Sequence, residues 1–301
     1  MKKISVVISA YNEQQLIEDC LKSARLVADE IIFVDNTSED RTVEIAKKYT
    51  NKIFIRPNDP VMLNKNKNFG FGKATGNWII SLDADERLTK ELIREIRSKI
   101  SVNQFSGYEI PRKNIIFGKW IRHSIWWPDY NLRLFRRGKG KFPEKHVHEK
   151  LVVTGDVGKL TNPLIHYNYQ TVSQFIQKLD KTYTESETEN FLKSGQQIVW
   201  HDAIRWPTND FVKTFFFEKG YKDGIHGLIL SMFQAFYSLV FFAKVWERKE
   251  KFADLTPDNF LSEVVKEFSN VTRDIRYWIY QTLIEANPAK KLYYKLRRKI
   301  S

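Results

Sequence analysis

The sequence predicts an α/β fold: a mostly parallel sheet with flanking helices over residues 1–170, followed by a mainly α-helical region over residues 171–301. Two observations carry this prediction. Short apolar runs typical of buried strands alternate with amphipathic stretches over about the first hundred residues, a rhythm that implies parallel strands joined by right-handed crossovers. Beyond about residue 170 the apolar residues recur with helical spacing only.

The expected sheet is Rossmann-like and begins near the N-terminus. Asn12 with Gln15, and Thr37 with Asp40, have the spacing of a capping box, so helices are expected to begin at these pairs. Another amphipathic helix is expected around residues 92–96. The apolar runs predicted as buried strands are Ile4–Ser9, Ile31–Val34, Lys52–Ile55 and Trp78–Leu82, with a later strand at Leu132–Arg136.

The most informative stretch of the chain is residues 76–87, G-N-W-I-I-S-L-D-A-D-E-R. Asp83 and Asp85 follow its strand, and if the backbone stays extended there, their side chains lie on the same side. Two such carboxylates suit a hard divalent cation whose shell is completed by phosphates, and ligands of open α/β sheets bind beyond the carboxyl ends of the strands. The alternative is a polar turn with acidic residues at the start of the next helix.

Polar residues also follow the first two predicted strands. Asp35 comes directly after the second strand, where a carboxylate commonly binds ribose hydroxyls or a base edge. No glycine lies between Ile4 and Glu13, where a dinucleotide fingerprint would fall. The pattern therefore argues against nicotinamide or flavin and favours a nucleotide whose diphosphate is bound through a metal.

Composition limits the class of partner. The formal net charge is +13, which favours nucleic acid, anionic lipid or phosphorylated small molecules. No recognised nucleic-acid-binding motif is present, so we expect no nucleic acid partner, and a basic nucleic-acid-binding protein is kept as a distant alternative. The one cysteine, Cys20, excludes an internal disulfide and fits a reducing compartment. The N-terminal apolar run is too short for an export signal.

Several ordered motifs resemble one family. They are I-S-V-V-I-S-A-Y-N-E, I-I-F-V-D-N-T-S-E-D-R-T and K-A-T-G-N-W-I-I-S-L-D-A-D-E-R, followed by P-D-Y-N-L-R-L-F-R-R-G at 128–138, V-H-E-K-L at 147–151 and P-L-I-H-Y at 163–167. Together they resemble the inverting glycosyltransferases of family 2, which have the GT-A fold, and in particular the branch that includes lipopolysaccharide-core glucosyltransferases. The resemblance is strong over residues 1–170 and weaker over 171–245.

The resemblance implies a nucleotide-sugar site and a metal site. Asp83 and Asp85 would form the D-x-D pair that binds Mn²⁺ or Mg²⁺, with Asp85 the more direct ligand. Arg133 and Arg136 are further candidates, since guanidinium groups bind phosphate through planar forks. A solvated basic loop is the alternative for Lys65 and Lys67. The expected nucleotide-sugar residues are Ala10, Tyr11, Glu13, Asp35, Lys65, Lys67, Asn68, Asp83, Ala84, Arg133 and Arg136.

The catalytic base is the open assignment. Many family 2 enzymes carry a Glu-Asp pair after the strand that follows the D-x-D helix, and this chain has none there. Glu149 is the first candidate and Asp129 the second. The alternatives are a salt bridge for Glu149, a turn role for Asp129, and neither residue as the base. His146 and His148 form an H-x-H motif, but the further ligands of a zinc site are missing. Separately, His148 or His166 is a candidate to contact the diphosphate or the metal ion. A structural role is the alternative for either histidine.

The expected function is a metal-assisted single displacement that moves a sugar, with inversion, from a UDP-hexose to a lipid-linked or lipopolysaccharide-type acceptor. The alternatives are a polyprenyl-phosphate glycosyltransferase and an inactive sugar-nucleotide-binding scaffold. Residues 227–243 contain no charged residue, and they are expected to lie on an anionic membrane surface, with a buried helix and a true span as alternatives. The basic, aromatic segment at 289–301 would suit the same surface. The expected location is cytoplasmic, peripheral to the inner face of the cell membrane.

Overall fold

The structure is a computed structural model that describes residues 2–59, 64–102, 104–144 and 149–300. The chain divides into two compact units. The first, which we call the sheet unit, is Met1–Trp120 with Trp126–Gln170. The second, the helical unit, is Thr171–Ser301 with the short segment Ile121–Ile125.

The sheet unit is built on a ten-stranded sheet in the order β3-β2-β1-β4-β8-β6-β12-β5, with β7 and β11 also paired to β6. The first four strands are parallel, as predicted. β8 pairs antiparallel to β4 and β6, so the sheet as a whole is mixed. The strands are β1 Ile4–Ala10, β2 Glu30–Asp35, β3 Ile53–Ile55, β4 Trp78–Asp83, β5 Glu86–Arg87, β6 Gly107–Ile116, β7 Lys119–Trp120, β8 Asp129–Arg136, β11 Val157–Lys159 and β12 Leu164–Tyr169, and β9 Gly140–Lys141 pairs separately with β10 Val152–Val153.

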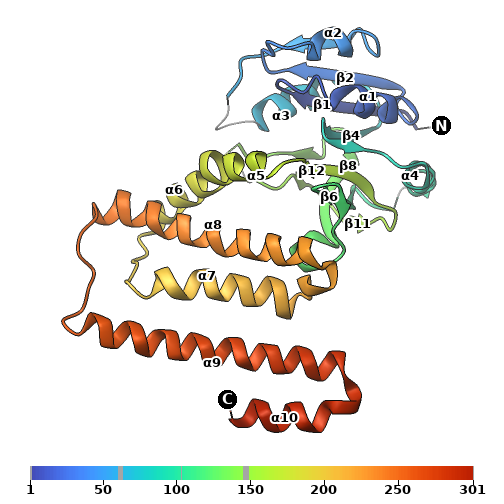
Figure 1. The fold of residues 1–301 in the computed structure, drawn as a ribbon. Coiled ribbons are helices and arrows are strands. Elements are labelled where there is room, and N and C mark those ends of the chain that lie inside the picture. The colour runs from blue at the N-terminus through green and yellow to red at the C-terminus, as the bar shows by residue number, and fades with distance from the viewer. Residues whose placement is uncertain (1, 60–63, 103, 145–148, 301) are drawn as a thin grey trace. The chain divides into compact units, whose positions relative to one another are not determined.

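Helices cover both faces of the parallel strands (Figure 1). They are α1 Ile17–Arg25, α2 Thr42–Ala46, α3 Asn64–Lys73 and α4 Lys90–Val102. Alternate side chains of each strand therefore pack into two core clusters, one on each face of the sheet. Ile8 of β1 packs with α1, whereas Val7 packs with Phe71 of α3. Burial on both faces explains why these strands are near-continuous apolar runs in the sequence.

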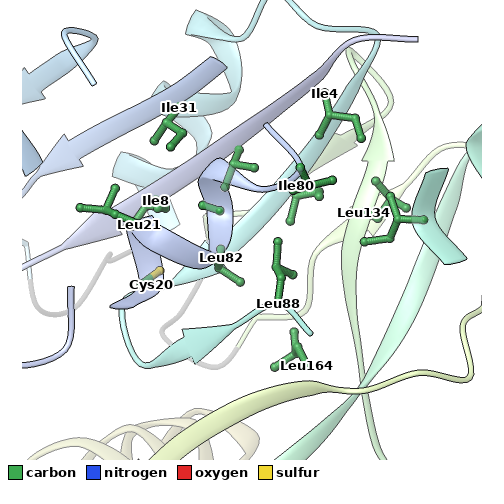
Figure 2. Close-up of a cluster of buried hydrophobic side chains, with 14 of the residues drawn as sticks. Ile4, Ile8, Cys20, Leu21, Ile31, Ile80, Leu82, Leu88, Leu134 and Leu164 are labelled. Carbon is green, nitrogen blue, oxygen red and sulfur yellow. The ribbon is translucent and has the colours of Figure 1, made fainter. Parts of the chain in front are cut away.

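The larger core cluster lies between the sheet and helices α1 and α4, and Figure 2 shows part of it. Leu21 of α1 and Ile80 of β4 are both fully buried there. Each aliphatic side chain of this kind contributes about 1.5–3 kcal/mol to folding. Cys20 is part of the same cluster, and burial raises the pKa of its thiol well above the ordinary value. It is a packing residue, not a reactive one.

The predicted capping boxes are wrong. Helix α1 begins at Ile17, and the side chain of Asn12 instead accepts a hydrogen bond from the backbone N–H of Glu39 at 2.9 Å. Helix α2 begins at Thr42, whose backbone N–H donates to Asp40 at 2.9 Å. These polar side chains join the loops after β1 and β2 to each other, and they thereby fix the edge of the sheet where the candidate site lies.

One partly buried ion pair in the sheet unit, Glu30 with Lys52, gives a testable pH dependence. Glu30 accepts hydrogen bonds from Ser5 Oγ at 2.5 Å and from the Thr75 backbone N–H at 2.6 Å, and it pairs with Lys52. Burial opposes ionisation, but these three partners outweigh it and lower the pKa of Glu30 to about 2 from the ordinary 4.5. The carboxylate form of Glu30 therefore stabilises the fold above the ordinary pKa, and this stabilisation is lost as the pH falls toward 2.

Replacement of Glu30 by glutamine is expected to lower the free energy of unfolding by about 2 kcal/mol at neutral pH, because charge-assisted hydrogen bonds are lost. The difference between wild type and variant should shrink as the pH falls from about 4.5 to about 2. Urea unfolding at several pH values measures it, with the exposed Glu44→Gln as the control. A difference that does not change down to pH 2 would contradict the assignment.

The helical unit contains the remaining α-helices. In Figure 1, α7 runs beside α8, and α9 lies beside α10. The elements are α5 Val172–Lys178, a π-helical turn η2 at Leu179–Tyr183, α6 Thr184–Ser194, α7 Asp202–Val212, a second π-helical turn η3 at Lys213–Phe217, the 3₁₀ turn η4 Gly220–Asp223, α8 Ile225–Glu250, α9 Phe260–Ala286, the 3₁₀ turn η5 Pro288–Lys290 and α10 Lys291–Ile300; a further 3₁₀ turn, η1, is Ser124–Trp126.

Helix α8 packs through its small and polar residues. Ser238 donates a hydrogen bond to Asp210 of α7, and Gln234 donates to the same carboxylate at 3.4 Å. A Cβ at Gly227 would lie 1.8 Å from the carbonyl oxygen of Gly220, so only glycine fits there. The opposite side of α8 exposes apolar residues at helical spacing: Ile225, Met232, Phe236 and Leu239.

Candidate active site

Three strands bring their carboxyl ends to one edge of the sheet. Ala10 at the end of β1 pairs with Asp35 at the end of β2, and Ser9 pairs with Asp83 at the end of β4. Asp35 is 1% exposed, and its Oδ2 accepts a hydrogen bond from the backbone N–H of Ser38 at 2.8 Å. Among the described residues its other oxygen, Oδ1, is buried and has no hydrogen-bond partner. A buried carboxylate oxygen in that state is a candidate acceptor for a donor group on a ligand.

Asp83 lies between two cationic side chains. Its Oδ1 is 2.6 Å from Lys67 Nζ of α3, and its Oδ2 is 2.6 Å from Arg133 Nη2 of β8. Burial opposes ionisation of Asp83, but the attraction of Arg133 and Lys67 outweighs it and holds the pKa of the carboxyl far below its ordinary value. The carboxylate at this edge of the sheet is therefore ionised and already paired.

Arg133 reaches this position through an irregularity in β8. Leu134 pairs with Tyr108 and Leu132 pairs with Glu109, so Arg133 is the extra residue of a β-bulge. A bulge turns a side chain away from the regular alternation, a device common beside active sites. The Arg133 side chain is 8% exposed, and among the described residues its Nε has no hydrogen-bond partner. That buried N–H can donate to an anionic ligand.

Asp85 lies in the turn after β4, beside a histidine of β12, the strand that pairs with β5 directly after this turn. The Nε2 atom of His166, on β12, is 3.4 Å from Asp85 Oδ2. Asn114 Nδ2 donates to the Trp126 carbonyl at 2.8 Å, so its Oδ1 is the acceptor for His166 Nδ1 at 2.6 Å. This hydrogen bond orients the ring of His166 so that Nε2 faces Asp85.

The Asp85–His166 pair supplies a carboxylate oxygen, the ligand that Mn²⁺ and Mg²⁺ prefer, and an imidazole nitrogen, which suits a transition metal such as Mn²⁺ better than Mg²⁺. Within the described ranges, no group of three or more ligating side chains is present. The donor set therefore fits a cation only if a bound ligand contributes further oxygens. The expected extended geometry at Asp83 and Asp85 is wrong, because β4 ends at Asp83 and the next two residues form a turn. Asp83 and Asp85 consequently face different partners.

The two candidate bases differ in their surroundings. Asp129 is part of a hydrogen-bonded network: Arg112 Nη2 is 2.6 Å from its Oδ2, and Asn131 Nδ2 donates to its Oδ1 at 2.8 Å. Glu149 is half-buried and accepts a hydrogen bond from the Glu144 backbone N–H at 2.7 Å. His146 and His148 lie outside the described residues. Assignment of the base to Glu149, Asp129 or neither stays a prediction.

The remaining predicted site residues are distributed unevenly. Lys65 is exposed and lies 3.5 Å from Asp59, and Tyr11 is also exposed at the end of β1. Asn68 bonds both the carbonyl and the N–H of Phe142, and so fixes that loop to α3. Glu13 and Ala84 belong to the loops after β1 and β4. Arg136 is not brought to the cluster, since its Nε donates to the Phe105 carbonyl and its guanidinium lies over Trp78.

Two residues of the cluster were not expected from the sequence. Glu86 is fully buried and bonds both Arg133 and the backbone of Asp83. Asn114 fixes the ring of His166. The only local sequence signal for a role of Glu86 is its position directly after the D-x-D pair. Asn114 carries no local signal, because its role depends on the pairing of β6 with β12.

The mixed sheet, with acidic and basic groups gathered beyond the ends of β1, β2 and β4, is the GT-A fold expected from the sequence. Residues 5–159, just over half of the chain, match the model of glycosyl transferase family 2. The chain belongs to that family and is a glycosyltransferase that resembles the lipopolysaccharide-core branch.

Full-length relatives agree with this assignment. The chain is 28% identical over 271 residues to the lipopolysaccharide core biosynthesis glycosyltransferase LpsC of Rhizobium meliloti, a match that covers 86% of this chain and 97% of the relative. It is 27% identical to an uncharacterized glycosyltransferase of Rickettsia typhi, over 87% of this chain and 93% of the relative. Among solved structures, residues 1–349 of Staphylococcus aureus TarS match with a TM-score of 0.41 and 15% identity, over 97% of this chain and 88% of that one.

Proposed function

We propose that the enzyme transfers a hexose from a UDP-sugar to a lipid-linked or lipopolysaccharide-type acceptor, in one metal-assisted displacement that inverts the anomeric carbon. The observation that carries the proposal is the Asp85–His166 pair beside Asp83, Lys67 and Arg133 at one sheet edge. Cationic side chains and a cation-binding pair so close together suit a diphosphate with its counter-ion. The name of the Rhizobium meliloti relative supports the choice of acceptor.

Each group has a role in this mechanism. Asp35 Oδ1 accepts a hydrogen bond from the uracil or the ribose, and the Nε of Arg133 and the ammonium of Lys67 bind diphosphate oxygens. Asp85 and His166 would hold the cation, which when bound would supply positive charge to offset the negative charge that grows on the leaving diphosphate. Glu149, or Asp129 in its place, accepts the proton of the attacking hydroxyl. The acceptor oxygen approaches opposite the leaving group, so no covalent enzyme intermediate forms.

Calorimetry with UDP in the presence of Mn²⁺ or of EDTA, followed by assay of UDP release from a panel of UDP-hexoses, tests the proposal. The expected result is UDP binding that Mn²⁺ strengthens, and UDP release that requires an added lipopolysaccharide-core acceptor. UDP binding that is equally strong in EDTA would contradict the metal-assisted mechanism. Release that requires polyprenyl phosphate instead would reassign the acceptor.

We also propose that the enzyme is cytoplasmic and binds the inner face of the cell membrane through its helical unit. In the part of the chain that the structure describes, α8 is the one helix long and apolar enough to cross a membrane by length and composition. One side of α8 packs on α7 through Ser238 and Gln234, which favours contact with a membrane surface over a lipid-surrounded span. Helix α10 adds exposed Leu292 and Leu296 beside basic residues, a combination that suits anionic lipid.

Charge reversal on α10 tests the membrane proposal. Lys291 and Lys295 are exposed and one helical turn apart, and each lysine near an anionic surface contributes about 1 kcal/mol. The double variant Lys291→Glu, Lys295→Glu is expected to weaken binding to vesicles of phosphatidylglycerol and phosphatidylcholine more than about tenfold in co-sedimentation. The control is Lys47→Glu, Lys48→Glu in the sheet unit. Equal loss in both variants would indicate attraction by net charge alone and would contradict the assignment to α10.

A further inference from the structure

Four charged side chains at the candidate site form one compact cluster with no formal net charge. Lys67 and Arg133 are its cations, and Asp83 and Glu86 are its anions. Arg133 Nη2 donates to Asp83 Oδ2 and to Glu86 Oε1, each at 2.6 Å, and Lys67 Nζ lies 2.6 Å from Asp83 Oδ1. We call these four residues the charge quartet. Glu86 is the member to which neither the sequence nor the family assignment gave a role.

Glu86 is 0% exposed, so its charge is removed from water and depends on its partners. Its Oε2 accepts a hydrogen bond from the backbone N–H of Asp83 at 3.0 Å, which closes the turn that contains Asp85. Its backbone pairs with that of His166 in the β5–β12 ladder. The same residue therefore touches the carboxylate that ends β4, the turn that carries Asp85, and the strand that carries His166.

Arg87 closes the turn from the other side. Its Nη1 donates to the carbonyl oxygens of Ala84 and Glu86, at 2.7 Å and 2.9 Å. The side chains of Glu86 and Arg87 thus hold the Asp83–Glu86 turn through hydrogen bonds to its backbone at both ends. An amide at position 86 can still accept the Asp83 N–H, so Glu86→Gln removes the charge while it keeps the side-chain size and one acceptor.

The charge balance affects how the site binds UDP with Mn²⁺, a ligand whose negative diphosphate binds together with a positive ion. In a site of low dielectric, one uncompensated unit charge a few ångströms away changes the affinity for a charged ligand by about tenfold or more. Because the quartet has no formal net charge, its two cations can contact diphosphate oxygens but leave no surplus positive charge to attract a diphosphate that arrives without a cation. If Glu86 were neutral, the quartet would carry one surplus positive charge, which would offset the nearby carboxylate of Asp85 and strengthen diphosphate binding in the absence of a metal.

We propose that Glu86 is a positioning residue that makes donor binding depend on the divalent cation, because it cancels the charge of Arg133 and fixes the turn that carries Asp85. The inference rests on the proposed function and deepens it. Two substitutions change the quartet in opposite directions. Glu86→Gln leaves it with one net positive charge, and Lys67→Met leaves it with one net negative charge.

The test is isothermal titration of UDP into each full-length variant, once with Mn²⁺ and once with EDTA. The measured quantity is the metal enhancement, the ratio of the dissociation constant in EDTA to that in Mn²⁺. Glu86→Gln is expected to lower the enhancement at least about tenfold, mainly through tighter binding in EDTA. Lys67→Met also removes a contact to the diphosphate, so it is expected to weaken UDP binding under both conditions. The loss should be larger in EDTA, so that the enhancement rises by a similar factor.

The matched control is Glu95→Gln, because Glu95 also accepts hydrogen bonds from backbone N–H groups, at Thr161 and Asn162, but lies on α4 away from the quartet. Its enhancement should equal that of the wild type. A merely structural role for Glu86 would weaken UDP binding equally in Mn²⁺ and in EDTA, and this result would overturn the inference. If Glu86→Gln does not fold, Lys67→Met still tests the inference. An unchanged metal enhancement in Lys67→Met would refute the claim that the charge of the quartet sets the metal dependence.

The same titration separates the two proposals. A wild-type protein whose UDP binding is not strengthened by Mn²⁺ contradicts the proposed function, and the inference about Glu86 is then refuted with it. A wild-type protein with clear metal enhancement, together with an unchanged ratio in Glu86→Gln, leaves the proposed function standing and refutes only the role of Glu86.

Discussion

Replacement of Asp85 by alanine is expected to abolish the Mn²⁺-dependent part of UDP binding and to lower kcat/KM by at least about 10³-fold. Asp85 Oδ2 lies 3.4 Å from His166 Nε2, and together they supply the protein ligands that we assign to the cation. Loss of the cation removes several kcal/mol of transition-state stabilisation, and each 1.4 kcal/mol corresponds to about tenfold in rate. Calorimetry and UDP-release kinetics measure the two effects.

The control for Asp85→Ala is Asp19→Ala, which removes an exposed carboxylate from α1 of the same unit. It should leave both metal dependence and turnover unchanged. His166→Ala should resemble Asp85→Ala in metal dependence, because the two side chains are assigned to one site. If Asp85→Ala bound UDP with Mn²⁺ as tightly as the wild type, the cation would have to bind elsewhere.

The second large effect concerns the base. Glu149→Gln is expected to lower kcat about 10²- to 10⁴-fold, the range for loss of a general base, with little change in the KM for the donor. Glutamine keeps the size of the side chain and cannot accept a proton. Single-turnover kinetics under saturating donor and acceptor measure the chemical step directly.

Asp129→Asn provides the contrast, because Asp129 is paired with Arg112 and bonded by Asn131. We expect this variant to lose thermal stability and to keep most of its kcat. The half-exposed Glu109→Gln is the control for a neutral change in the same sheet. A large kcat loss in Asp129→Asn with normal turnover in Glu149→Gln would reverse the assignment, and normal turnover in both would place the base at another residue.

The strands of the parallel half could be predicted because their signal is local. Both faces of β1, β2 and β4 are buried, so each strand is a short apolar run whatever its partners are. The ends of the runs then locate the edge of the sheet. Asp35 and Asp83 could be assigned to one site on that basis, and the structure places them on either side of β1.

The hydrogen bonds of the site could not be predicted, since they join residues far apart in the chain. Arg133 is 47 positions from Glu86, and it reaches Glu86 only through the bulge in β8. Asn12 has the spacing of a helix cap, but a tertiary hydrogen bond to the loop after β2 competes for its side chain and determines its role. Tertiary partners outweigh local propensity in both cases.

The pairing of Asp83 with Lys67 and Arg133 also bears on how the protein can be handled. Repulsion between crowded acidic groups commonly makes a cation-binding protein unfold when a chelator strips its metal, but here the fold itself supplies the compensating ammonium and guanidinium. Purification and storage in EDTA should therefore leave the protein intact, and activity should return as soon as a divalent salt is added back.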